Sequence, residues 1–91
     1  MAQLIKTTGE ILEISPKNGI NFKLDELQKY VDGYIEIVNL NNGEILVVNE
    51  DGKFIEEMNE KATDIAHNNQ AIFSSDYIAG NVVLCKDQEV Q

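Results

Sequence analysis

The sequence contains no arginine or tryptophan, and it has only one cysteine, one proline and one histidine. A single cysteine cannot form an intramolecular disulfide, so nothing in the sequence requires an oxidising compartment. No apolar run approaches the ~20 residues of a membrane-spanning helix, and the first residues lack the charged and long apolar regions of a signal peptide. We therefore expect a cytoplasmic protein that does not associate with a membrane.

Positive charge is also scarce. All 7 basic residues are lysines, and they are outnumbered by 16 acidic residues, which gives a net charge of −9. Binding to a phosphate backbone requires a clustered positive surface, so we do not expect direct contact with DNA or RNA. An acidic surface can instead attract a basic protein or imitate a nucleic acid. The simpler alternative is that the negative charge keeps a small protein soluble.

Residue types that serve in catalysis or metal binding are few, and their spacing matches no known motif. One Cys and one His do not satisfy the ligand spacing of a zinc site, and no glycine-rich phosphate loop occurs. His67, Ser74, Ser75 and Asp76 are close in sequence, yet no nucleophile-elbow motif accompanies them. Cys85 follows three apolar residues and is expected to be a buried, inert thiol. The sequence therefore predicts a non-enzymatic protein with no metal and no cofactor.

The 91 residues, 43% of them apolar, are typical of one globular domain covering residues 1–91. Hydrophobic periodicity predicts the following strands and helices. Strands are expected over residues 3–7, 11–14, 34–40, 44–49 and 82–85, with a further short strand at 53–55, and helices over 24–31 and 58–67. The order β-β-α-β-β-α-β predicts an α+β fold, with a mostly antiparallel sheet of about five strands and two short helices on one of its faces.

Local patterns support the central elements. Asn41, Asn42 and Gly43 tolerate the positive φ of a tight hairpin between the two firmest strands. The second of these strands, residues 45–48, is apolar on both faces, as expected of a central strand. Gly33 is placed to end the first helix.

Two surfaces are candidate partner-binding sites. If both helices cover one face of the sheet, the opposite face exposes Tyr34, Glu36 and Val38 for a partner or for self-association. The alternative is that residues 70–77 fold over that face. The second surface is an acidic stretch made of Glu50, Asp51, Glu56, Glu57, Glu60 and Asp64. It is either a docking surface for a basic partner or only a solvated face with favourable charge at a helix N-terminus.

Several segments together resemble a known family. They are residues 24–28, 31–33, 34–38, 43–53, 59–62 and 78–84, which span nearly the whole chain. The sequence is similar to the uncharacterised phage and mobile-element proteins grouped as domain of unknown function 3846. Members of the family often have glycine where this chain has Asp32, a change expected to alter only the helix cap.

The resemblance implies an origin in a bacteriophage, prophage or conjugative element and action inside a bacterial host cell, and it transfers no catalytic residues. Our main hypothesis is a protein that binds and modulates or inhibits a host protein with a basic surface, in the manner of an anti-defence protein. One alternative is a sponge that sequesters a signalling nucleotide at the interface of a homo-oligomer. Another is an enzyme with weak motifs that uses His67, Ser75 or Cys85.

Overall fold

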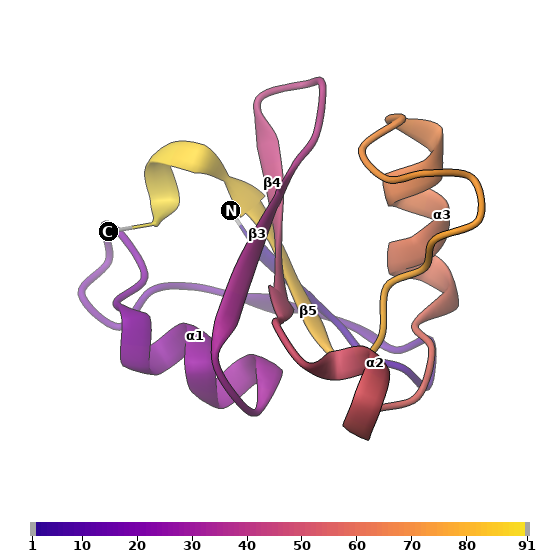
Figure 1. Ribbon diagram of the computed structural model, residues 1–91. Helices are drawn as coiled ribbons and strands as arrows, with labels where there is room; N and C mark the ends of the chain where they lie inside the picture. The colour runs from indigo at the N-terminus through magenta and orange to yellow at the C-terminus, as the bar shows by residue number, and fades with distance from the viewer. Residues whose placement is uncertain (1, 91) are drawn as a thin grey trace.

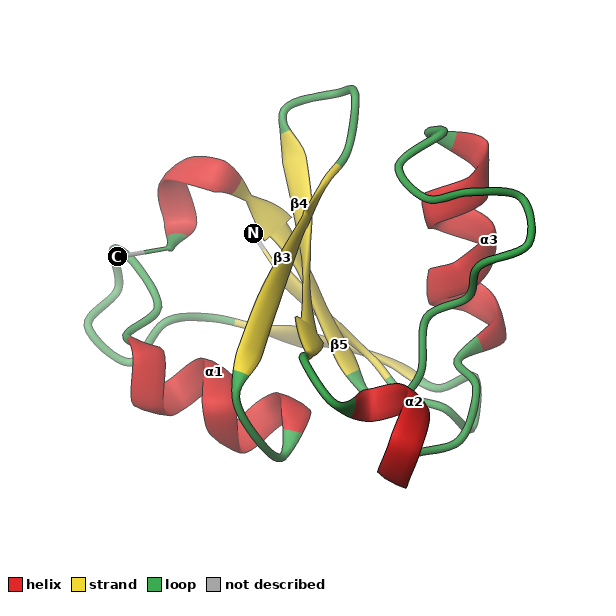
Figure 2. Ribbon diagram, viewed as in Figure 1, coloured by secondary structure: helices red, strands yellow, loops and turns green. Residues whose placement is uncertain are grey.

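The computed structural model describes residues 2–90, and its centre is an antiparallel five-stranded sheet with the strand order β2-β1-β5-β4-β3. The strands are β1 (Ala2–Ile5), β2 (Ile11–Ile14), β3 (Ile35–Asn39), β4 (Glu44–Asn49) and β5 (Val82–Lys86). The α-helices are α1 (Leu24–Val31), α2 (Gly52–Ile55) and α3 (Glu60–Asn68), and a short 3-10 helix, η1 (Asp87–Glu89), follows β5. The α+β class and the antiparallel sheet are as predicted (Figures 1 and 2).

The helices lie on both faces of the sheet, which corrects the expectation that they share one face. Figure 1 shows α1 and α3 on opposite sides of the strands. In β4, Ile45 and Val47 belong to the hydrophobic cluster under α1, whereas Leu46 and Val48 belong to the cluster under α3. Successive side chains of a strand point to opposite faces, so the continuous apolar run of β4 reflects a sheet that is covered on both sides.

A short helix, α2, stands where the sequence predicted a strand over residues 53–55. β3 and β5 already occupy both sides of β4, so a strand over residues 53–55 could not pair with β4 as the next strand of a hairpin. The chain turns instead, because the Asn49 carboxamide oxygen accepts a hydrogen bond from the Asp51 amide at 2.8 Å. Gly52 then passes so close to the Ala79 carbonyl oxygen that a Cβ atom would lie only 2.7 Å from it.

Helix α1 ends at Val31 as predicted, but the residue that caps it differs. The left-handed residue is Asp32, with φ of 64°, and not Gly33. The buried Asn49 side chain donates to the carbonyl oxygens of Val31 and Asp32 at 3.0 and 3.2 Å. Gly33 is required for a steric reason, because a Cβ atom there would lie 2.8 Å from the Asn49 amide nitrogen.

Asn59 joins three separate parts of the fold. Its carboxamide oxygen accepts from the Ala62 amide at 3.0 Å and so caps α3, as asparagine does at helix N-termini. Its amide nitrogen donates to the carbonyl oxygens of Ile5 and Gly80, both at 2.9 Å. The side chain is completely buried, so it fixes α3 against the ends of β1 and β5.

Candidate functional site

The sheet face that carries Glu36 and Val38 is partly covered beside β3 and β4. Residues of the segment 72–79 and of α2 form, with these strands, a hollow of about 180 Å³, which we call the α2 hollow. Its lining includes Glu36, Val38, Glu50, Lys53, Phe54 and Tyr77. The irregular segment after α3 thus lies beside this face and packs with the half-buried Val38 on the same hydrophobic cluster. Tyr34 and Glu36 are nevertheless exposed, so both the partner-binding surface and its covering remain predictions there.

A charged pair closes one side of the α2 hollow. The Lys53 ammonium group donates to the Asp76 carboxylate and lies 5.2 Å from the centre of the Tyr77 ring. The hydrogen bond to Asp76, together with the nearby negative charges, raises the pKa of Lys53 above its ordinary value. The pKa of Asp76 is lowered by the hydrogen bond from Lys53 and by a second one from the Tyr77 amide at 2.8 Å. The pair links α2 to the segment around residue 76.

Large apolar side chains are exposed next to the α2 hollow. Phe54 and Ile55 in α2 are 86% and 65% exposed, and Phe73, on the segment that covers the sheet, is 82% exposed. Exposed carboxylates of Glu50, Asp51 and Glu57 flank α2 on both sides in the chain. We call Glu50, Asp51, Phe54, Ile55 and Glu57 the α2 surface. Apolar side chains surrounded by charge of one sign are typical of protein-binding surfaces.

The α2 surface contains only part of the predicted site. Glu36, Val38 and Glu50 are brought together at the α2 hollow, while Tyr34 is 70% exposed just before β3. Glu60 lines a different depression, together with Lys6 and Lys61. Glu56 packs its aliphatic stem against Gly80, and Asp64 is exposed one turn along α3 from Glu60. The acidic stretch is thus divided between two places rather than forming a single edge.

The exposed aromatic residues and the Lys53–Asp76 pair were missed by sequence reasoning. The predicted strand at 53–55 assigned Phe54 and Ile55 to the sheet, and nothing in the sequence connects two residues that are 23 positions apart. The one available signal was Asp51-Gly52 followed by Glu56-Glu57, because turn residues and charges that enclose two apolar side chains favour an exposed turn.

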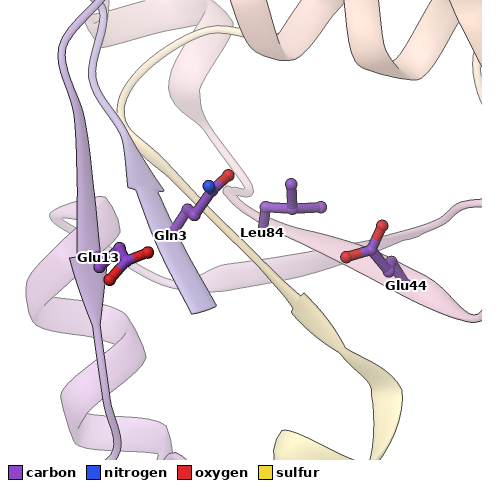
Figure 3. A pocket seen from close by; sticks show the side chains of 4 residues that line it. All are labelled: Gln3, Glu13, Glu44 and Leu84. Carbon is purple, nitrogen blue, oxygen red and sulfur yellow. The ribbon is translucent and has the colours of Figure 1, made fainter. Parts of the chain in front are cut away.

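A second hollow, of about 300 Å³, lies beside the middle of β5, on the sheet face where Leu84 belongs to the cluster under α3 (Figure 3). It is lined by Gln3 and Leu84, with Glu13 and Glu44 on either side. These side chains come from four adjacent strands, β2, β1, β5 and β4. Among residues 2–90, the lining has two carboxylates and no cation, nucleophile or imidazole, so these residues provide a shallow acidic surface and no evident chemistry.

The residues considered for catalysis are used otherwise. The His67 Nε2 atom lies 2.8 Å from the carbonyl oxygen of Asp76, and the Asp76 carboxylate faces Lys53 instead of the imidazole. Cys85 is completely buried, and burial raises the pKa of its thiol to about 12. A thiolate is the reactive form, so Cys85 is inert at neutral pH.

Within residues 2–90, no group of three or more His, Cys, Asp or Glu side chains is arranged to hold a metal ion. None of the helices in this part of the chain is long and apolar enough to cross a lipid bilayer.

A family model described as a domain of unknown function, DUF3846, matches residues 3–91. The chain belongs to this family. No curated protein and no solved structure matches it. The DUF3846 match confirms the resemblance found from the sequence, and because the family description assigns no activity, the function has to be argued from the geometry.

Proposed function

We propose that this DUF3846 protein is a non-enzymatic binding protein that modulates or inhibits a host protein with a basic surface, in a phage or mobile-element setting. The observation that supports this is the α2 surface, where Phe54 and Ile55 are strongly exposed beside Glu50, Asp51 and Glu57. Apolar anchors supply contact free energy, and surrounding charge speeds the encounter with a partner of opposite sign. The net charge of −9 favours the same class of partner.

The internal contacts of the α2 surface are consistent with this role. Lys53, the cation nearest to Phe54 in the chain, is engaged by Asp76 and Tyr77, so it does not offset the carboxylates that face solvent. Gly52 is locked against Ala79, which holds α2 in place without burying its apolar side chains. A preformed surface loses little conformational entropy on binding.

The first test is capture of partners from host lysate at low and high salt, followed by titration of the purified partner. We expect a partner whose affinity falls as salt rises, because exposed charges are screened within about 10 Å at 0.1 M salt. In the double variant Phe54→Ser and Ile55→Ser, loss of the apolar anchors should weaken binding at least about tenfold. Both side chains are exposed in the free protein, so its stability should change little.

A charge-matched pair of variants separates local from overall electrostatics. Glu50→Lys with Glu57→Lys changes the net charge by the same amount as Asp25→Lys with Asp87→Lys, and all four residues are exposed. Asp25 is in the first turn of α1, at the opposite end from Val31 and Asp32, which bond to Asn49 shortly before α2, and Asp87 begins η1 after β5. Only the first pair should abolish binding. Equal effects of both pairs would show that binding depends on general electrostatic attraction and not on this site. If a cyclic nucleotide raised the thermal stability of the protein and no basic protein partner were found, the nucleotide-sequestering alternative would be favoured.

A further inference from the structure

β3 is an edge strand whose outer side has no neighbour in the described chain. The sheet order places β4 on one side of β3 and nothing on the other. The Glu50 amide donates to the Tyr34 carbonyl oxygen, and the Leu40 amide donates to the Glu44 carbonyl oxygen, both at 2.9 Å. These bonds show which residues of the strand face β4.

Hydrogen-bonded positions alternate along an antiparallel pair. Since Tyr34 and Leu40 face β4, so do Glu36 and Val38, which lie opposite Val48 and Leu46. The backbone N–H and C=O groups of Ile35, Ile37 and Asn39 therefore point away from the sheet. No backbone or side-chain bond to another residue among 2–90 engages them. Such a row of free groups is a template for an additional strand.

The opposite edge of the sheet is a weaker template. The Lys6 amide donates to the Glu10 carbonyl oxygen, so alternation along β2 leaves only Ile11 and Glu13 facing outward. β2 ends next to Ser15 and Pro16, where the chain turns. β3 has three residues whose backbone N–H and C=O groups point away from the sheet, and β2 has only two. β3 is therefore the better position for an added strand.

The side chains of β3 define the chemistry of its partner. On the α1 side of the sheet, Ile37 is 38% exposed and Ile35 is half-buried. On the other side, Glu36 is exposed at the α2 hollow, which Glu50 also lines. A strand added beside β3 would place alternate side chains against Ile35 and Ile37 on one face and against Glu36 and Val38 on the other.

A second copy of the chain is a poor candidate for this strand. Each copy carries a net charge of −9, and its β3 contains Glu36 and no lysine. We propose that the outer edge of β3 pairs with an extended segment of another protein in which lysine or arginine alternates with apolar residues. This inference rests on the proposed function, and it specifies how a basic partner is held. Main-chain hydrogen bonds would supply affinity, and the alternation of side chains would supply specificity.

The test uses a capped peptide of about eight residues, a common strand length, with alternating lysine and valine. Two control peptides replace lysine by glutamate, or keep the composition with all lysines at one end. Amide hydrogen exchange and NMR chemical shifts are measured residue by residue. The alternating peptide should slow exchange of the Ile35, Ile37 and Asn39 amides at least about tenfold. The Glu36 and Val38 amides, already bonded to β4, serve as internal references and should change little.

Proline variants at the two edges give a matched pair. Ile37→Pro removes an outward N–H group, which an edge strand tolerates, and Ile11→Pro makes the same change on β2. Ile37→Pro should weaken peptide binding at least about tenfold, and Ile11→Pro should leave it unchanged. Folding of each variant is checked by the exchange rates of β5, which lies in the interior of the sheet.

Four results would overturn the inference, and the fourth would leave the proposed function intact. The first is peptide binding with shifts confined to the α2 surface, and the second is equal binding of both lysine peptides. The third is protection of the β3 amides that grows with protein concentration alone, which would assign the edge to a second copy. A natural basic partner that still binds Ile37→Pro but not the Phe54 and Ile55 variant would refute the edge and leave the proposed function intact. Absence of any basic partner would refute the proposed function itself.

Discussion

Replacement of Asn59 tests whether one buried carboxamide holds α3 to the sheet. Asn59→Ala removes the N-cap of α3, which costs about 1 kcal/mol. It also removes a donor from the buried carbonyl oxygens of Ile5 and Gly80, at about 1 to 1.5 kcal/mol each. The sum is about 3 to 4 kcal/mol, from a total stability of about 5 to 9 kcal/mol for a chain of this length. The variant should fold, but with about half of the free energy of unfolding.

The measurement is urea denaturation followed by circular dichroism. With a slope of about 1 kcal/mol per molar urea, the midpoint should fall by about 3 M. Asn68→Ala is the control, because Asn68 is exposed in the same helix, and it should change stability by less than about 0.5 kcal/mol. A loss below about 1 kcal/mol for Asn59→Ala would show that the three hydrogen bonds are dispensable.

The near-isosteric change Asn59→Asp adds a dependence on pH. A carboxylate there would face the carbonyl oxygens of Ile5 and Gly80 with no donor between them, in a fully buried position. Burial would raise the pKa of the new carboxyl above its unfolded value of about 3.9. A raised folded pKa means that stability is lost as pH rises above the unfolded pKa. The deficit relative to wild type should therefore grow between about pH 4 and pH 7, and a constant deficit would contradict this account.

Three further predictions concern other groups. The thiol of Cys85, whose pKa is raised to about 12 by burial, should resist thiol reagents at pH 8 and react only on unfolding. Burial of the neutral thiol should stabilise the fold fully below the unfolded thiol pKa, and this stabilisation should be lost as pH rises towards 12. Rapid modification of the native protein would refute its burial. Lys53→Gln should raise the lowered pKa of Asp76 in an NMR titration, with incomplete recovery because the Tyr77 amide still donates to it; an unchanged pKa would exclude the pair in solution. Asp32→Gly should leave the free energy of unfolding unchanged or raise it by up to about 1 kcal/mol, because Asp32 has a φ of 64°, which glycine adopts without strain. A decrease measured by urea denaturation would show that the Asp32 side chain stabilises the fold by more than its backbone strain costs.

Local sequence signals predicted most of the secondary structure. The helix over 24–31 and the strands over 11–14 and 44–49 have the predicted bounds. The hairpin at residues 41–43 is confirmed, with φ of 85° at Gly43. These elements are determined by side-chain periodicity and turn residues, which act over a few positions along the chain.

The failures involve contacts between distant residues. The helical turn at 52–55 depends on Asn49 and on the approach of Gly52 to Ala79, and neither contact has a local pattern. The placement of α1 and α3 on opposite faces was indicated by the two-sided apolar run of β4, but the prediction used that run only to place β4 in the sheet. The α2 hollow required the covering segment after α3, whose position no periodicity specifies.

The position of β5 has a consequence for the order of folding. β1 and β2 form one hairpin and β3 and β4 form another, while β5, which follows both in the chain, lies between them in the sheet. During synthesis both hairpins leave the ribosome before the strand that joins them, and each exposes an unpaired inner strand until then. Assembly of the sheet must therefore wait for residues 82–86, so we expect slow, late closure of the kind that pairing between distant segments imposes.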